Sequence, residues 1–283
     1  MTFAVVVVLH GSRPELSELL PTLPKAQLVV VDTGPGDGGA DLARRRGATV
    51  IERRDNPGFG AACNLALEHV TQDVTILLNP DTIDGNGALR RLAARAQQPG
   101  LHAPRLLNAN GSVQRSAHPL PGTLGAFLPA VVHPPLLPRA LRVRAEPHRH
   151  NVPHTVGWAV AACLAATTRT LRQLGPFDSR IHLFGEDMDL CLRAREQGIR
   201  TILHPDLAIF HTGRHSVPDE PFDALARARR DVVLRRRGRR ALALDDAAQA
   251  LTFATRALVK RPNDRERAQL KALLGSRDRA GAP

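Results

Sequence analysis

The sequence predicts an α/β protein in which a mostly parallel sheet is flanked by helices. Three observations support this prediction: short runs of β-branched and aliphatic residues recur through residues 1–82, helical stretches separate these runs, and polar loops follow their ends. Strands that alternate with helices of this length form βαβ units, which build a parallel sheet. Ligands bind beyond the carboxyl ends of the strands in such a sheet, so the polar loops are candidate site segments.

The expected strands of this first part are rich in Val, Leu and Ile, and they cover residues 5–9, 28–31, 50–51 and 74–78. Helices are expected between them at residues 14–23, 39–46 and 60–70. The polar loops at the strand ends then cover residues 10–13, 32–38 and 79–82. Because only 3% of the residues are aromatic, the core must be built from Val, Leu, Ile and Ala.

The pattern changes twice further along the chain. Residues 101–151 contain repeated prolines, which predict a long excursion without a continuous element. Regular structure is expected again from residue 156, with a helix at 186–197 and strands at 201–203 and 207–210. Two further helices are expected at 222–237 and 247–259. We therefore expect an α/β domain at residues 1–220 and a basic helical extension at residues 221–283.

The net charge is +12 with a pI of about 11.2, and Arg supplies most of the positive charge. This excess favours anionic partners such as phosphorylated small molecules, acidic lipid headgroups or nucleic acid. A general bias of the composition toward Arg and Ala is the alternative explanation. For the basic C-terminal helices, an anionic membrane surface is one expected partner. A solvated helical hairpin or a dimer contact is the other interpretation, and the oligomeric state stays open.

The cysteines and the N-terminal run point to the cytoplasm. Cys63, Cys163 and Cys191 are isolated and lack metal-ligand spacing, which indicates reduced, mostly buried thiols. The apolar run at residues 3–9 lacks a basic leader and a cleavage site, so we expect a buried strand rather than a signal peptide. No segment is long and apolar enough to be expected to cross a bilayer.

Asp81 follows the expected strand at residues 74–78 directly, within the loop Asn79-Pro80-Asp81-Thr82. A carboxylate at this position lies on the ligand side of the sheet, where it can hold a hard divalent cation. Asp also opens turns after proline, and this structural interpretation stays open.

Three carboxylates, Glu186, Asp187 and Asp189, lie within four positions at the start of an expected helix. Acidic side chains at a helix N-terminus are stabilised by the helix dipole, which offers a structural explanation. The apolar approach at residues 183–185 predicts that at least one carboxylate is partly buried. A carboxylate in such surroundings is a candidate general base.

Two further segments are candidates for binding. His211 follows the last apolar strand and precedes Thr212 and Gly213, so it could be a metal ligand on the same side as Asp81, although a lone His is more often structural. The segment 53–64 contains Asn56, Gly58 and Asn64, and its small residues would let a diphosphate approach backbone N–H groups. It matches neither the dinucleotide fingerprint nor the phosphate loop of NTPases.

In this order, the segments resemble the inverting family 2 glycosyltransferases of GT-A fold, and they look closest to bacterial rhamnosyltransferases of cell-wall and polysaccharide assembly. The resemblance spans about residues 3–216. Its most specific motifs are LLNPDT at 77–82, NGSVQRSAHPLP at 110–121, VGWAVAACL at 156–164 and GPFDSRIHLFGEDMDLCLRAREQGIR at 175–200, followed by FHTGRHS at 210–216.

The resemblance implies a role for each matching residue. Asp32 would hold the nucleotide base with the segment from Asn56 to Asn64, including Gly58, nearby. Asn79 and Asp81 occupy the family's Asp-x-Asp motif, which binds Mg²⁺ or Mn²⁺ and the diphosphate. Asp187 matches the catalytic base, although Glu186 or Asp189 could act instead. His211 matches a metal ligand of some members, and Trp158 is placed to border the acceptor, with an ordinary core position as the alternative.

The resemblance further implies a dTDP-, UDP- or GDP-linked sugar donor, a deoxyhexose such as rhamnose as the transferred group, and a glycan or polyprenyl-linked acceptor. It also implies work at the inner face of the plasma membrane. Two other functions fit parts of the sequence. A nucleotidyltransferase would share the sheet and the metal-binding acid, but residues 10–13 are a poor version of its signature. A basic nucleic-acid-binding protein fits the charge, but few aromatics and no known binding module are present, so we expect no nucleic acid partner.

Overall fold

The computed structural model describes residues 2–132, 136–175, 177–213, 222–259 and 264–278. The chain divides into two compact units, which are treated separately below. The first unit comprises residues 1–117 and 150–216, and the second comprises residues 118–149 and 217–283.

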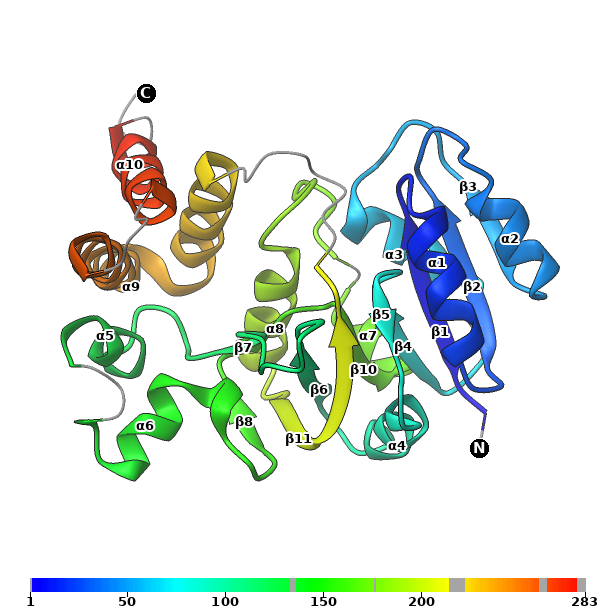
Figure 1. Ribbon diagram of the computed structural model, residues 1–283, viewed down its shortest axis with the longest axis horizontal. Coiled ribbons are helices and arrows are strands. Elements are labelled where there is room, and N and C mark those ends of the chain that lie inside the picture. The colour runs from blue at the N-terminus through cyan, green and yellow to red at the C-terminus, as the bar shows by residue number, and fades with distance from the viewer. Residues whose placement is uncertain (1, 133–135, 176, 214–221, 260–263, 279–283) are drawn as a thin grey trace. The chain divides into compact units, whose positions relative to one another are not determined.

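The first unit contains a nine-stranded sheet with the order β3-β2-β1-β4-β10-β6-β11-β5, and β8 pairs with β11 outside this path (Figure 1). Its strands are β1 (Ala4–Leu9), β2 (Gln27–Asp32), β3 (Thr49–Glu52), β4 (Val74–Leu78), β5 (Thr82–Ile83), β6 (Leu101–Leu107), β8 (His154–Val156), β10 (Cys163–Thr167) and β11 (Thr201–His211). β1, β2, β3, β4, β6 and β11 share one direction, whereas β5, β8 and β10 run against them. The mostly parallel α/β sheet predicted from the sequence is confirmed.

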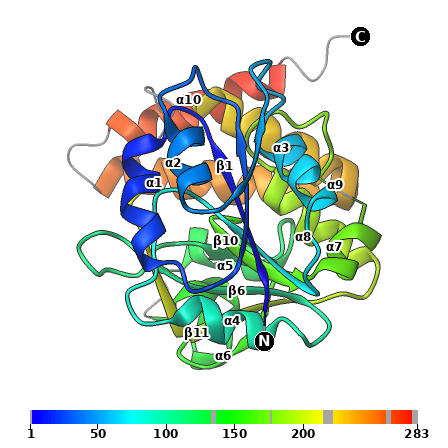
Figure 2. The same ribbon diagram turned by 90° about the vertical axis from the view of Figure 1, so that its right-hand side faces the viewer.

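Side chains along a strand alternate between the two faces of the sheet. Both faces of this sheet carry apolar side chains, and helices cover both of them. On β1, Val6 belongs to one buried cluster and its neighbours Val5 and Val7 to the other. The helices that cover the face of Val6 are α3 (Phe59–Glu68), α7 (Thr168–Gln173) and α8 (Glu186–Glu196). The helices on the opposite face are α1 (Arg13–Leu19), α2 (Gly39–Arg45) and α4 (Ala88–Arg95). Figure 2 shows α1 and α2 on one side of β1 and α3 and α7 on the other.

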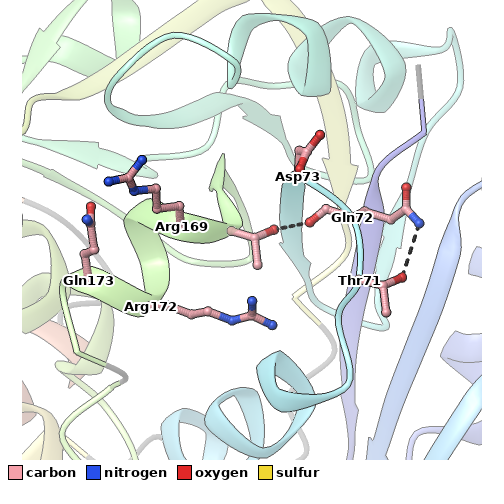
Figure 3. Close-up of a pocket in the computed structure, with 7 residues that line it drawn as sticks. Thr71, Gln72, Asp73, Arg169, Arg172 and Gln173 are labelled. Carbon is pink, nitrogen blue, oxygen red and sulfur yellow. Dashed lines mark hydrogen bonds between the residues drawn. The ribbon is translucent and has the colours of Figure 1, made fainter.

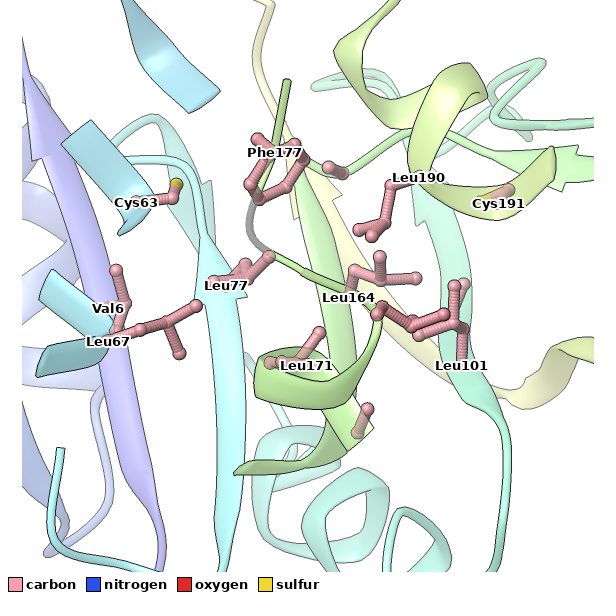
Figure 4. Close-up of a cluster of buried hydrophobic side chains, with 14 of the residues drawn as sticks. Val6, Cys63, Leu67, Leu77, Leu101, Leu164, Leu171, Phe177, Leu190 and Cys191 are labelled. Atoms are coloured by element: carbon pink, nitrogen blue, oxygen red, sulfur yellow. The ribbon is translucent and has the colours of Figure 1, made fainter. Parts of the chain in front are cut away.

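The core on the face of Val6 is aliphatic, as the composition predicted. Leu77 and Leu164 face each other across the β4–β10 pair, and Leu67, Leu171 and Leu190 reach this layer from the three helices (Figure 4). Burying such side chains contributes roughly 1.5–3 kcal/mol each to folding.

The structure corrects two expectations for the sheet. Residues 101–107 do not belong to a Pro-rich excursion, because they form β6 between β10 and β11. The two strands expected at 201–203 and 207–210 are one strand, β11, with a bulge between His204 and Ala208 where it pairs with β6. Pro205 lies in this irregular stretch, where a residue without a backbone N–H is tolerated.

The remaining short elements lie outside the main sheet. A 3₁₀ helix, η1 (Leu20–Thr22), follows α1, and β7 (Ala117–His118) pairs with β9 (Trp158–Ala159) in a two-stranded sheet. The second unit is helical, with α5 (Leu124–Val131), α6 (Arg139–Ala145), a 3₁₀ helix η3 (Pro147–Arg149), α9 (Phe222–Val259) and α10 (Asp264–Asp278). α9 combines the two expected C-terminal helices, with non-helical φ and ψ at Gly238 between them.

The second unit combines part of the expected excursion with the C-terminal helices, whereas we expected one boundary at residue 220. That boundary stays a prediction. None of the helices formed by the described residues is long and apolar enough to cross a membrane.

Candidate active site

The candidate residues come together at one edge of the sheet in the first unit. Asp32 ends β2, Asp81 follows β4 and His211 ends β11, and these three strands share one direction. β10 runs against them, so its first residue and the preceding residues 160–162 lie at the same edge. The parallel register therefore gathers loops that are far apart in the sequence.

Asp32 is fully buried, and its carboxylate is held by groups from two loops. Its Oδ1 accepts a hydrogen bond from the backbone N–H of Gly34 at 3.0 Å, and its Oδ2 lies 3.2 Å from Arg54 Nη1. A Cβ atom on Gly34 would lie 2.4 Å from the backbone nitrogen of Gly11, so the loops after β1 and β2 touch here. Arg54 also pairs with Glu52 and donates to the carbonyl of Gly34. Arg54 thus fixes the carboxylate predicted to meet the nucleotide base.

The segment before α3 is bound tightly to the segment before α8. Gly58 has φ of +91°, and a Cβ there would lie 2.2 Å from the carbonyl oxygen of His182. Asn64 donates to the carbonyl of Phe177 at 2.8 Å and accepts from its N–H at 2.7 Å. Asn56 has a positive φ of +43°, which Asn tolerates better than most residues. Because the amide of Asn64 is occupied by Phe177, the structure gives this residue a structural contact; its predicted nucleotide contact stays a prediction.

Asp81 and His211 are brought together as the sequence predicted. β5 pairs with the end of β11, and Thr212 donates its N–H to the carbonyl of Asp81 at 3.0 Å. Asp81 Oδ1 then lies 3.3 Å from His211 Nε2, and the two side chains are only 9% and 13% exposed.

Gln114 fixes the orientation of the His211 ring. Its Oε1 lies 2.8 Å from His211 Nδ1, while its Nε2 donates to Asn108 Oδ1 at 3.1 Å. An amide oxygen only accepts, so in the neutral ring Nδ1 carries the proton and Nε2 presents its lone pair toward Asp81. Sequence reasoning missed this role of Gln114.

A divalent cation fits between these two side chains. A carboxylate oxygen and an unprotonated imidazole nitrogen that face each other are ligands for Mn²⁺ or Mg²⁺, and a partner on the second ring nitrogen is usual for metal-binding His. Among the described residues no group of three or more His, Cys, Asp or Glu side chains is placed to hold a metal. Asp81 and His211 would therefore supply two ligands, leaving the others to a bound diphosphate and water.

Asp187 lies at the start of α8, where Gly185 is the N-cap with φ of +87°. Its Oδ1 accepts from the N–H of Met188 at 2.7 Å, and its Oδ2 lies 3.4 Å from the N–H of Ala161. Burial raises the pKa of Asp187, and these backbone N–H groups oppose the shift. A carboxylate with a raised pKa that is held in place by backbone donors suits a general base near neutral pH.

Glu186 lies beside Asp187, and the two carboxyl groups influence each other. Burial and, second, the negative charge of Asp187 raise the pKa of Glu186. Its Oε2 is buried without a hydrogen-bond partner among the described residues. Two carboxyl groups this close titrate as a coupled pair, so a negative charge on one raises the proton affinity of the other.

Asp189 has different surroundings. It is fully buried, and its Oδ2 accepts from Arg193 Nε at 2.8 Å, one turn further along α8. Arg193 also donates to the carbonyls of Leu174 and Gly175. The geometry therefore gives Asp189 a structural ion pair with Arg193, and its candidate role as the base stays a prediction.

Asn79 and Trp158 are linked to the site through one segment. The N–H of Asn79 donates to the carbonyl of Ala162 at 2.9 Å, next to the Ala161 that contacts Asp187. The side-chain amide of Asn79 makes no hydrogen bond with the described residues. Trp158 is partly buried and packs against the core cluster on the side of α3 and α8, so the core alternative describes most of its contacts.

A separate cavity lies away from these residues. Its volume is about 400 Å³, and it is bounded by Thr71, Gln72 and Asp73 before β4 and by Arg169, Arg172 and Gln173 on α7 (Figure 3). Because β4 begins at Val74, this cavity is at the opposite edge of the sheet from Asp81. Arg172 uses its guanidinium to bind the carbonyls of Leu67 and Val70. The cavity holds none of the candidate site residues.

Comparisons with known proteins agree on one family of folds. A Mycobacterium tuberculosis protein named N-acetylglucosaminyl-diphospho-decaprenol L-rhamnosyltransferase is 27% identical over 248 residues, which cover 78% of this chain and 80% of that protein. The mannosyltransferase PcManGT from Pyrobaculum calidifontis, solved with GDP-Man and Mn²⁺, has a TM-score of 0.58 at 17% identity and covers 98% of this chain and 86% of that one. S. aureus TarS 1-349 with UDP-GlcNAc has a TM-score of 0.55 at 16% identity over 98% and 80% of the two chains.

The sequence identity to the solved structures is low, so they show the fold alone. The family itself rests on a sequence model: the model described as "Glycosyltransferase like family 2" matches residues 27–239, which is more than half of the chain. That match includes Asp32, Asp81, Asp187 and His211, and it agrees with the resemblance and with the GT-A fold. This chain belongs to glycosyltransferase family 2.

Proposed function

We propose that this protein is an inverting glycosyltransferase that moves a deoxyhexose such as rhamnose from a nucleoside-diphosphate donor to a glycan or polyprenyl-linked acceptor. The observation that carries the proposal is Asp187, a half-buried carboxylate held by the N–H groups of Met188 and Ala161 at the edge of the sheet where Asp81 and His211 also lie. The name of the Mycobacterium tuberculosis relative supports both the sugar and the polyprenyl acceptor.

The reaction follows from this arrangement as a single displacement. Asp187 takes the proton of an acceptor hydroxyl while that oxygen attacks the anomeric carbon of the donor. The bond between the anomeric carbon and the diphosphate breaks, and the nucleoside diphosphate leaves on the opposite face. Attack from the face opposite the leaving group inverts the anomeric centre.

Donor binding is assigned to the loops at the same edge. Asp32, oriented by Arg54 and Gly34, meets the nucleotide base, and the segment with Asn56 and Gly58 lies in the next loop of this edge. Asp81 and His211 would hold Mg²⁺ or Mn²⁺, and a bound cation would neutralise negative charge on the departing diphosphate. The Mn²⁺ in the PcManGT complex is consistent with a divalent cation in this fold.

The same proposal places the protein in the cytoplasm, at the inner face of the plasma membrane, in cell-wall or polysaccharide biosynthesis. A polyprenyl-linked acceptor would be reached at that surface. The family match argues against the two alternatives from the sequence, a nucleotidyltransferase and a nucleic-acid-binding protein.

A donor screen tests the proposal. The full chain is heated with dTDP-, UDP- and GDP-linked sugars, each with and without Mn²⁺ or Mg²⁺. Ligand binding to the folded state raises the melting temperature, so one nucleotide class should raise it by about 4 °C or more at saturating ligand. The cation should increase this effect in the wild type and not in Asp81→Ala. If no nucleotide sugar stabilises the protein, the proposal is wrong.

A further inference from the structure

α5 in the second unit is an apolar helix with exposed aliphatic side chains at both ends. Its eight residues, LGAFLPAV, carry no charge, and only Ala130 is buried. Leu124 is 72% exposed and Val131 is 58% exposed at its two ends. Leu136, the first described residue after residues 133–135, is 77% exposed. A group of exposed large aliphatic side chains on consecutive segments marks an interaction surface.

A basic helix, α6, packs against α5. α6 carries Arg139, Arg142 and Arg144, and all three are exposed. A Cβ on Gly125 would lie 3.6 Å from Cβ of Arg144, so α5 and α6 are in contact. Arg139 and Arg144 form no ion pair with the described residues. These charges are available to an external partner.

Two arginines of α9 form ion pairs within their own helix. Arg229 pairs with Asp245 at 2.8 Å, and Arg230 pairs with Asp246. Both aspartates are buried, so these ion pairs hold the two halves of α9 together across the break at Gly238. Two charges of α9 are therefore used in internal ion pairs, whereas Arg139 and Arg144 of α6 form none with the described residues.

We propose that Leu124, Val131 and Leu136, together with Arg139 and Arg144, form a surface that binds a phospholipid bilayer containing anionic lipids. An apolar side beside a basic side is the arrangement of interfacial helices, in which the apolar residues enter the acyl boundary and the arginines meet phosphate groups. The proposal does not depend on which sugar or acceptor the enzyme uses.

Vesicle flotation of the full chain tests the proposal. Wild type should float with vesicles of phosphatidylglycerol and phosphatidylcholine and remain at the bottom with phosphatidylcholine alone. The double variant Leu124→Glu/Leu136→Glu should lose binding by about tenfold or more, because two charges would enter the acyl boundary. Leu258→Glu is the matched control, since Leu258 is 85% exposed on α9 of the same unit, and it should float like wild type.

The charge contribution has its own pair of variants. Arg139→Gln/Arg144→Gln should weaken binding to the anionic vesicles, while Arg237→Gln/Arg240→Gln on α9 should not. Circular dichroism and donor-induced thermal shift identify any variant that has lost its fold.

Three outcomes would overturn the proposal: wild type that does not float, a Leu258→Glu variant that loses as much binding as the double variant, or α9 arginine variants that weaken binding as much as the α6 variants. Light scattering tests whether a second copy of this chain occupies the surface instead. A dimer that Leu124→Glu/Leu136→Glu dissociates would assign the surface to a second copy of this chain. The donor screen reports on sugar transfer separately, so either proposal can fail alone.

Discussion

Asp187 and Asp189 are two residues apart on α8, yet they have opposite surroundings. Asp187 accepts only backbone N–H groups, and burial raises its pKa. Asp189 is fully buried against the guanidinium of Arg193. The first arrangement leaves a carboxylate that can take a proton, and the second neutralises a carboxylate to hold the protein together.

We predict that Asp189 contributes to stability, whereas Asp187 does not. Asp189→Asn should lower the free energy of unfolding by about 3 kcal/mol, because removing one partner of a buried ion pair leaves the other unpaired. Asp187→Asn should leave it equal or higher at pH 7, since the ionised form is the one that burial disfavours. Urea unfolding measures both. A greater loss in Asp187→Asn than in Asp189→Asn would contradict these assignments.

Gln114 is predicted to act on the metal through His211. Gln114→Leu removes the acceptor for Nδ1–H, so the ring can rotate or change tautomer, and Mn²⁺ affinity should fall about tenfold. Nitrogen NMR of His211 should show the tautomer change, which a purely structural role would not produce. Gln72→Ala, at the opposite edge of the sheet, is the control. Unchanged Mn²⁺ binding and an unchanged His211 tautomer in Gln114→Leu would rule out the role.

At the scale of elements, the site depends on the contact between the start of α3 and the segment before α8. Gly58 has φ of +91° and ψ of 163°, a conformation that is essentially restricted to glycine. Its α-carbon faces the carbonyl of His182, which leaves no room for a side chain. Asn64 and Phe177 add two hydrogen bonds less than two turns further along α3.

Gly58→Ala should therefore be more harmful than a positive φ alone explains. Gly47 is the matched control, because it also has a positive φ of +80° but no heavy atom within 4 Å of an added Cβ. We expect Gly47→Ala to cost about 1 kcal/mol of unfolding free energy and Gly58→Ala about 3 kcal/mol or more. Thermal or urea unfolding compares them. Equal losses in the two variants would show that the 177–182 segment yields to the new side chain.

The sequence was sufficient for the elements whose periodicity is local. The strands before Asp32 and Asp81 and the helix that begins with Glu186 were predicted within one or two residues, because hydrophobic runs and Gly-rich turns mark their ends. β10 and the sheet position of β6 were not predicted, since small residues and prolines conceal them and pairing with distant strands defines them.

At the scale of the whole molecule, a buried histidine pair links β6 and β11. His102 Nδ1 lies 2.9 Å from His204 Nε2, and His102 Nε2 lies 3.1 Å from the carbonyl of Gln98. Arg95 approaches the remaining nitrogen of His204 at 3.4 Å. A carbonyl only accepts and a guanidinium only donates, so these two groups fix the direction of the hydrogen bonds when both rings are neutral. His102 Nε2–H donates to Gln98, His204 Nε2–H donates to His102 Nδ1, and His204 Nδ1 accepts from Arg95. Burial lowers the pKa of both histidines, for His204 to about 4.

This pair makes stability depend on pH. His204 takes up a proton in the unfolded chain near pH 6.5 but in the folded protein only near pH 4. The stability it contributes is complete above pH 6.5 and declines as the pH falls through that window, by about 1.4 kcal/mol for each pH unit. His204→Gln should flatten this slope, and His69→Gln, at an exposed position, should not. Urea unfolding from pH 7 to pH 4 would refute the interpretation if wild type and His204→Gln show the same slope.

Long-range contacts explain what the sequence left undetermined in the site. Gln114 and His211 are 97 residues apart, and Asp187 and Ala161 are 26 apart. The sequence could predict that Asp81 and His211 lie on the same side because both follow strands of the same sheet. Gln114 lies in a loop within the motif at 110–121, and only the fold shows which ring it meets. The division into two units likewise joins residues 118–149 to the C-terminal helices, which no local pattern indicated.

The most direct test of the central claim is sugar transfer by Asp187→Asn compared with wild type, with the donor identified by the thermal screen. The account predicts that the variant binds this donor with nearly unchanged affinity, while turnover falls by roughly 10²–10⁴-fold and the wild-type product carries the inverted anomeric configuration. It also predicts that wild-type turnover declines as the pH drops below about 6, the value to which burial raises the pKa of Asp187. Normal turnover in Asp187→Asn, or a product that retains the donor configuration, would contradict the account.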